Sequence, residues 1–103
     1  INRALKLSLA AAEKGFPQSM SMVASILAIY EKPQSMVWLA LALKANELSS
    51  DQYKLDPKLY EVVKKTMDEL YAQMTEEKIA AFYRDVEKKK HIYERAAQLG
   101  KDD

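Results

Sequence analysis

The single histidine is the residue best suited to acid–base or metal chemistry in this chain. His91 follows Glu87 by four residues and precedes Glu94 by three, a spacing that places the three side chains along one face of a helix. Such a group could orient an imidazole or bind a metal weakly. With one histidine and no cysteine, a site built from several such ligands is excluded. A surface salt bridge is the favoured interpretation, and we expect no metal and no cofactor.

Covalent and acid–base catalysis find little support in the remaining polar residues. The carboxylate pairs are adjacent in sequence, so their side chains point to different sides of a helix instead of facing each other across a substrate. Two glycines are too few for a glycine-rich phosphate loop. The serines have no histidine base near them. We therefore expect that the protein is not an enzyme. The residues considered are Asp68–Glu69, Glu76–Glu77, Ser19, Ser21, Ser25 and Ser35.

A basic cluster near the end of the chain could contact phosphate or an anionic membrane surface. It contains residues 88–90 with Arg84 and Arg95, but interleaved acidic residues favour a solvated helix face. The formal net charge is only +1, which argues against a nucleic-acid partner. The longest unbroken apolar run, Met36–Leu43, is far shorter than the ~20 residues that a membrane span requires. We expect a soluble chain that neither binds nucleic acid nor spans a membrane.

Glycines and prolines are few, and they stand between segments whose apolar residues recur at helical spacing. Gly15 supplies a left-handed stop after the first segment, and Asn46 is expected to do the same after the third. Asp56 followed by Pro57, and Thr75 followed by two glutamates, are typical helix starts. We expect an all-α chain of about five helices, over residues 3–14, 18–31, 34–45 and 57–74 and from residue 75 onward, the last one long.

The same features suggest how the chain is organised. We expect one helical-repeat domain over residues 1–103, with a repeat unit at 1–48, a connector at 49–56 and C-terminal helices at 57–103. The chain begins at Ile1 and not at methionine, which predicts a fragment of a longer protein. The compartment stays open, because an upstream signal peptide would place the domain in the periplasm or outside the cell and its absence would leave it in the cytoplasm.

A twelve-residue pattern recurs at residues 4–15, 35–46 and, more weakly, 89–100. Each copy has a bulky residue at the fourth place, alanine at the eighth, and glycine or asparagine at the twelfth. We interpret the pattern as a helix whose alanines let a neighbouring helix approach closely, while the bulky side chain fills the gap above. The glycine or asparagine then turns the chain into the next helix.

This pattern resembles the Sel-one-like repeat, a relative of the tetratricopeptide repeat. The residues that carry the resemblance are Ala4, Ala11–Ala12, Gly15, Trp38 at the aromatic place, Ile92–Tyr93, Ala96–Ala97 and Gly100. The chain departs from the family pattern in the short spacing between its first two copies, and residues 47–74 carry almost no repeat signature. The resemblance implies a short α-solenoid of antiparallel helix pairs with a concave surface, used as a scaffold or adaptor.

We therefore expect a protein–protein interaction module that binds a peptide or another protein on its concave face. The resemblance implies that one helix of each pair lines that face, here the helices at 18–31 and 58–73. Candidate contact residues are Ser21, Ser25, Tyr60, Lys64 and Tyr71. The alternative for the two tyrosines is that they flank the core.

A second hypothesis assigns association to the C-terminal helix, residues 75–99. If this helix is continuous through His91, an apolar stripe projects beyond the core and seeks a second copy of the chain or a following repeat. That stripe is Ile92, Tyr93, Ala96 and Leu99. The alternative is that the helix breaks near Lys90 and folds back. Binding of a small molecule or of an anionic surface is a further alternative.

Overall fold

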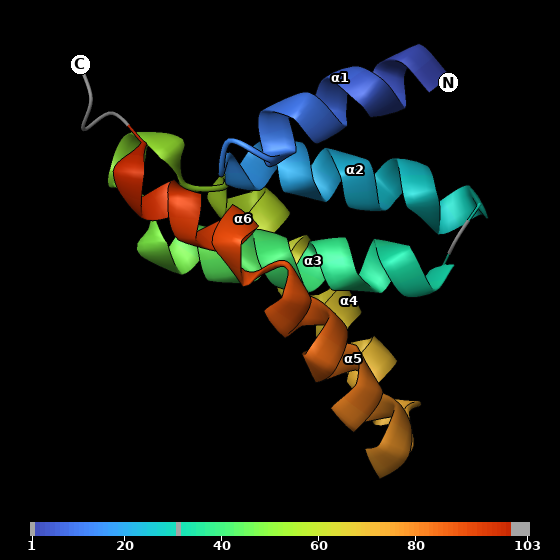
Figure 1. Cartoon of the computed structure of the whole chain (residues 1–103). Coiled ribbons are helices and arrows are strands. Elements are labelled where there is room, and N and C mark those ends of the chain that lie inside the picture. The colour runs from blue at the N-terminus through green and yellow to red at the C-terminus, as the bar shows by residue number, and fades with distance from the viewer. Residues whose placement is uncertain (1, 31, 100–103) are drawn as a thin grey trace.

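A computed structural model describes residues 2–30 and 32–99, and these residues form an all-helical structure without strands (Figure 1). The all-α prediction is confirmed, but the expected five helices become six α-helices and two short 3₁₀ helices over the described residues. In chain order they are α1 (Asn2–Ala12), α2 (Pro17–Tyr30), α3 (Lys32–Leu48), η1 (Asp51–Tyr53), α4 (Pro57–Ala72), α5 (Glu76–Lys88), α6 (Lys90–Glu94) and η2 (Arg95–Gln98).

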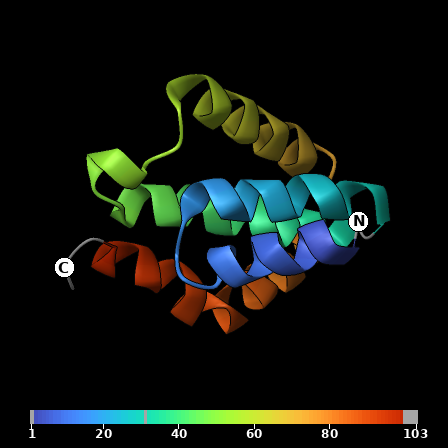
Figure 2. The same ribbon diagram turned by 90° about the horizontal axis from the view of Figure 1, so that it is seen from above.

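Helices α1, α2 and α3 lie side by side, each antiparallel to the one before it (Figures 1 and 2). Small residues allow α2 and α3 to approach closely. Ser35 of α3 is buried and donates its hydroxyl hydrogen bond to the Ala24 carbonyl of α2 at 2.6 Å. Ala42 is fully buried, while Ala11 is partly buried. The central helix α3 consequently supplies much of the core.

The turn between α1 and α2 depends on Gly15, which has a φ of 105°. This confirms the predicted left-handed stop, because residues with a side chain rarely adopt such a backbone conformation. The backbone of η2 lies directly against this turn. A Cβ atom placed on Gly15 would lie 2.6 Å from the Ala96 nitrogen and 2.7 Å from the Arg95 carbonyl carbon. Arg95 also donates from Nη1 to the Glu13 carbonyl at 2.5 Å.

The predicted stop at Asn46 is wrong, because α3 continues through this residue to Leu48. Asn46 instead accepts hydrogen bonds from the connector that follows α3. Its Oδ1 accepts from the Leu55 N–H at 2.6 Å, and its carbonyl accepts from the Lys54 ammonium at 2.6 Å. The third predicted stop, Gly100, lies outside the described residues.

Helices α4 and α5 form a fork that straddles α3, with α4 on one side and α5 on the other (Figure 2). Both predicted starts are confirmed. The Asp56 carboxylate accepts from the Lys58 N–H at 3.0 Å, and the Thr75 hydroxyl accepts from the Lys78 N–H at 3.2 Å. Of the buried residues of the fork, Met67, Phe82 and Val86 join the core around α3, and Val63 faces α2 and α3 across a small cavity.

The expected continuous helix over residues 75–99 is wrong, because α5 ends at Lys88 and the chain bends at Lys89. The bend returns α6 and η2 to α3, where Ile92 is 7% exposed and Ala96 is 1% exposed. A straight helix would have carried these side chains into water, at a cost of roughly 1.5–3 kcal/mol for the isoleucine alone. The segment therefore folds back, and no glycine or proline is required at the bend.

Candidate partner-binding groove

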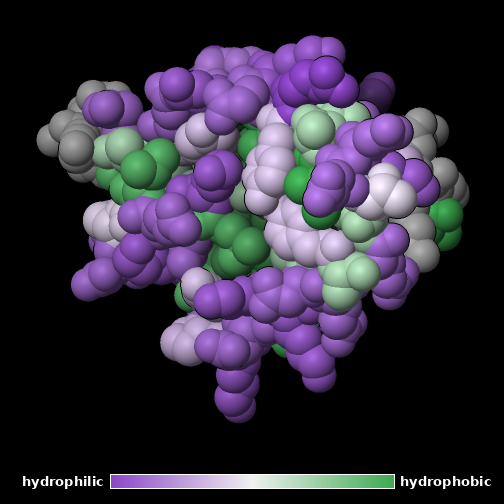
Figure 3. Space-filling view, turned by 90° about the horizontal axis from the view of Figure 1, so that it is seen from below, coloured by the Kyte–Doolittle hydropathy of each residue, from purple (hydrophilic) through white to green (hydrophobic). Residues whose placement is uncertain are grey.

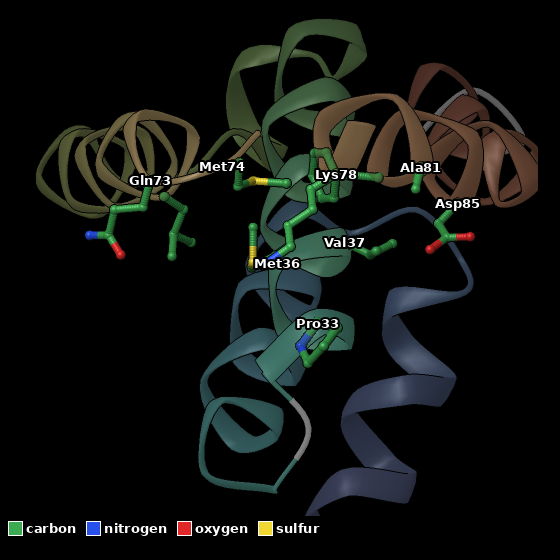
Figure 4. A pocket seen from close by; sticks show the side chains of 10 residues that line it. Pro33, Met36, Val37, Gln73, Met74, Lys78, Ala81 and Asp85 are labelled. Carbon is green, nitrogen blue, oxygen red and sulfur yellow. The ribbon is translucent and has the colours of Figure 1, made fainter. Parts of the chain in front are cut away.

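An apolar groove lies where the tip of the α4–α5 fork meets the first half of α3 (Figure 4). It encloses about 480 Å³ and is open to the surface. We call it the α4–α5 groove. Its lining residues are Pro33, Met36 and Val37 from α3; Leu70, Gln73 and Met74 from the end of α4 and the turn; and Lys78, Ala81, Phe82 and Asp85 from α5.

The floor of the groove is an extension of the protein core. Val37 and Phe82 are almost fully buried, whereas Met36 and Met74 are partly buried and reach the opening. Methionine side chains are unbranched and polarisable, so they adapt to differently shaped apolar partners. In the view from below, apolar side chains appear between hydrophilic ridges on the face that carries the fork (Figure 3). The groove thus exposes an apolar, deformable surface within a polar rim.

Three polar side chains, Gln73, Lys78 and Asp85, complete the groove. Figure 4 shows the Lys78 side chain extending across the groove toward Met36. Asp85 has a loose, exposed ion pair with Lys88, with 4.0 Å between the charged atoms. Within the ranges that the structure describes, no carboxylate pairs with Lys78. Among the described residues, Lys78 is therefore the groove-lining charge that no ion pair neutralises.

A second cavity of about 230 Å³ lies between α2, α3 and α4 and shares Met36 and Leu70 with the groove. We call it the α2–α4 cavity. The hydroxyl groups that line it are already used, because each donates to a backbone carbonyl, and its remaining lining is apolar. These bonds are Ser21 to Gln18 at 2.7 Å, Ser25 to Ser21 at 3.1 Å, Ser35 to Ala24 at 2.6 Å and Thr66 to Val62 at 2.8 Å.

The five predicted contact residues do not meet at one place. Ser21 and Ser25 line the α2–α4 cavity, but Ser21 is buried and both hydroxyls bond within α2. Tyr60 is partly buried and Lys64 is exposed on α4, and neither lines the groove or the α2–α4 cavity. Tyr71 packs instead against the aromatic residues of α5.

Tyr71 belongs to an aromatic cluster at the back of the fork. Its ring lies edge-on to Phe82, with 5.7 Å between centroids, and stacks on Tyr83 at 6.1 Å. Burial is the main reason that the pKa of Tyr71 is raised above its ordinary value. Its ring contacts with Phe82 and Tyr83 make Tyr71 a packing residue that joins α4 to α5.

The predicted association stripe does not form a free surface. Ile92 and Ala96 are buried, and Tyr93 and Leu99 are partly buried and pack against the core. The Lys44 ammonium also lies 5.7 Å from the centre of the Tyr93 ring. The stripe is therefore used within the chain, where it closes the fold over α3.

The surface salt bridge expected for His91 is not among the ion pairs of the described residues. His91 is exposed, and the neighbouring ion pair joins Lys90 to Glu94 at 3.7 Å. In the described part of the chain, no three histidine, cysteine or acidic side chains gather closely enough to hold a metal ion. No described helix is both long enough and apolar enough to cross a membrane.

Sequence reasoning missed the residues that form the groove, chiefly Met36, Met74, Lys78 and Ala81. The positions of Met36 and Met74 could have indicated the groove, because each methionine lies near one end of a helix and not in its middle. Which of these ends meet depends on how the fork crosses α3, and this crossing is a tertiary feature. Comparison with protein-family models, with curated proteins and with solved structures found no match.

Proposed function

We propose that this chain is a protein-interaction module whose α4–α5 groove binds an apolar segment of another protein. The observation that carries the proposal is the open groove of about 480 Å³, whose floor of Val37 and Phe82 is continuous with the core. Its size lies in the range of roughly 300–1,000 Å³ typical of ligand sites. The flexible methionines at its opening would let it adjust to the side chains that enter it.

A binding role fits the groove better than a catalytic one. The polar side chains at the groove are one amide, one ammonium and one carboxylate, and none of the ten lining residues is a serine, histidine or threonine. Catalysis by a hydroxyl nucleophile would need such groups beside a base within hydrogen-bond distance. We therefore propose a non-enzymatic scaffold or adaptor.

The resemblance to Sel-one-like repeats supports the same role. The closely packed antiparallel helices α2 and α3, with Ser35 and Ala24 at their contact, have the small-residue packing that such repeats use. Helical arrays of this kind commonly bind other proteins through surfaces formed between their helices. We propose that the chain is a divergent member of this repeat class, and that the α4–α5 groove replaces the concave face as its binding surface.

The proposal is tested with a displayed peptide library selected on the purified chain. The blocking variant is Ala81→Arg, which places a long charged side chain in the groove. Ala80→Arg is the matched control, because Ala80 is an exposed alanine of the same helix that does not line the groove. Circular dichroism establishes that both variants keep the helical fold.

We expect selected peptides to bind the parent chain and Ala80→Arg equally, and to lose at least tenfold in affinity for Ala81→Arg. Tenfold corresponds to about 1.4 kcal/mol, a small loss for an apolar side chain excluded from its pocket. Peptides that bind the Ala81 variant as tightly as the parent chain would refute the groove as the binding surface.

A further inference from the structure

We infer that the segment bound in the α4–α5 groove is an amphipathic α-helix that carries an acidic side chain opposite Lys78. This inference rests on the proposed function and specifies the partner. It draws on three properties of the groove, namely its hydrogen-bonding capacity, its length and its unpaired charge.

Hydrogen-bonding capacity favours a helix over an extended peptide. Seven of the ten lining residues are apolar, and the three polar ones are Gln73, Lys78 and Asp85. The described ranges contain no strand, so no sheet edge is available there to pair with an extended backbone. An extended peptide would bury backbone N–H and C=O groups without partners, at a cost of roughly 1–3 kcal/mol each. A helix satisfies these groups internally and presents only side chains.

The length of the groove matches two turns of such a helix. Its α5 wall runs from Lys78 to Asp85, and seven residues at about 1.5 Å each span ~10 Å. Apolar residues at positions i, i+3 or i+4, and i+7 of a partner helix cover the same distance. The groove adjoins the α2–α4 cavity at Met36 and Leu70, which line both.

The charge at the groove selects an acidic flank. Lys78 reaches across the opening, and no described carboxylate pairs with it. Asp85 at the other end already has Lys88 within 4.0 Å. Glu76 and Glu77 lie on the first turn of α5 but do not line the groove. A carboxylate from the partner would therefore find an ammonium at the groove edge whose stem rests on apolar side chains.

The test compares two displayed libraries with the same randomised apolar and charged positions. The first consists of helical peptides of about 16 residues, because shorter isolated helices are marginal in water. The second has a central proline that breaks the helix. Both are selected on the parent chain, on Lys78→Glu, and on Lys65→Glu as the matched control. Lys65 is an exposed lysine of α4 that lines neither the groove nor the α2–α4 cavity.

We expect the helical library to be enriched on the parent chain and on the control, with aspartate or glutamate preferred at the position facing residue 78. Selection on Lys78→Glu should exchange this preference for lysine or arginine, and acidic clones should lose about tenfold in affinity. Enrichment of the proline library, or an unchanged charge preference on Lys78→Glu, would overturn the inference. The proposed groove would survive that result if Ala81→Arg still blocked binding. If no clone of either library binds the parent chain, both proposals fail.

Discussion

Replacing the buried Gly15 by alanine is expected to destabilise the protein strongly. The native φ of 105° is rarely adopted by a residue with a side chain, and forcing it costs roughly 1–3 kcal/mol. The added Cβ would also lie 2.6 Å from the Ala96 nitrogen, closer than real contacts allow. The atoms nearest to this Cβ belong to the η2 backbone, so η2 must move as a whole to make room for it.

Moving η2 weakens the contacts that hold the last segment to the first turn. The Arg95 hydrogen bond to the Glu13 carbonyl contributes about 1 kcal/mol, and burial of Ala96 adds to it. Together with the backbone strain, we expect a loss of about 3 kcal/mol in the free energy of unfolding. For a domain of this size, that corresponds to a decrease of roughly 12–24 °C in melting temperature.

Thermal unfolding followed by far-ultraviolet circular dichroism measures this loss. Lys14→Ala is the matched control, because Lys14 is the exposed neighbour of Gly15 and should change the melting temperature by no more than ~2–4 °C. Fluorescence of the only tryptophan gives a second readout. Trp38 is buried, with the Lys89 ammonium 5.8 Å from its ring centre, so displacement of the last segment should shift its emission to longer wavelength. A melting temperature within a few degrees of the parent chain would refute the reasoning.

Three further substitutions test the fork. Met67→Ala should lower the free energy of unfolding by roughly 2–5 kcal/mol in chemical denaturation, because Met67 of α4 is 1% exposed and packs into the core. A loss below about 1 kcal/mol would contradict that packing. Asp56→Ala removes the cap of α4 and should cost about 0.5–2 kcal/mol in the same assay, whereas an unchanged midpoint would show that Pro57 alone starts the helix. Tyr71 keeps its proton in the folded state after the unfolded chain has lost it, so its contribution to the free energy of unfolding should be constant up to about pH 10 and fall at higher pH. Tyr71→Phe should lessen that fall, and an identical alkaline profile for both chains would count against the buried phenol.

Helix starts and one stop were predictable because their causes are local. Asp56, which precedes Pro57, and the hydroxyl of Thr75 each bind a backbone N–H within the first turn of their helix. The neighbouring residues in the sequence therefore suffice to locate both helix starts. Gly15 likewise combines a local stop signal with a left-handed backbone. The all-helical class follows from such signals together with the apolar spacing between them.

Asn46 and the bend at Lys89 were not predictable, because both depend on distant groups. Asn46 remains helical because its side chain binds the Leu55 N–H in the connector, which a local pattern does not reveal. The polar stretch before Ile92 made a break near Lys90 the stated alternative, but without glycine or proline it did not decide for the bend that places Ile92 on α3. In both cases long-range contacts outweigh local preference.

The candidate site was the least predictable part for the same reason. Ser21 and Ser25 were chosen as surface contacts, but their hydroxyls bond to backbone carbonyls of their own helix. The groove combines Met36 and Lys78, which are far apart in the chain and carry no shared motif. Their meeting is set by the crossing of the fork over α3, and the order of helices alone does not determine it.

The hydrogen bond from Arg95 to Glu13 joins residues 82 positions apart. During synthesis, the first helical hairpin leaves the ribosome long before the segment that completes its surroundings has been made. Helices α1, α2 and α3 contact one another, so they can pack as soon as residue 48 has been made, whereas the turn at Gly15 stays uncovered until η2 follows. Closure over this turn should therefore come after the packing of the first three helices.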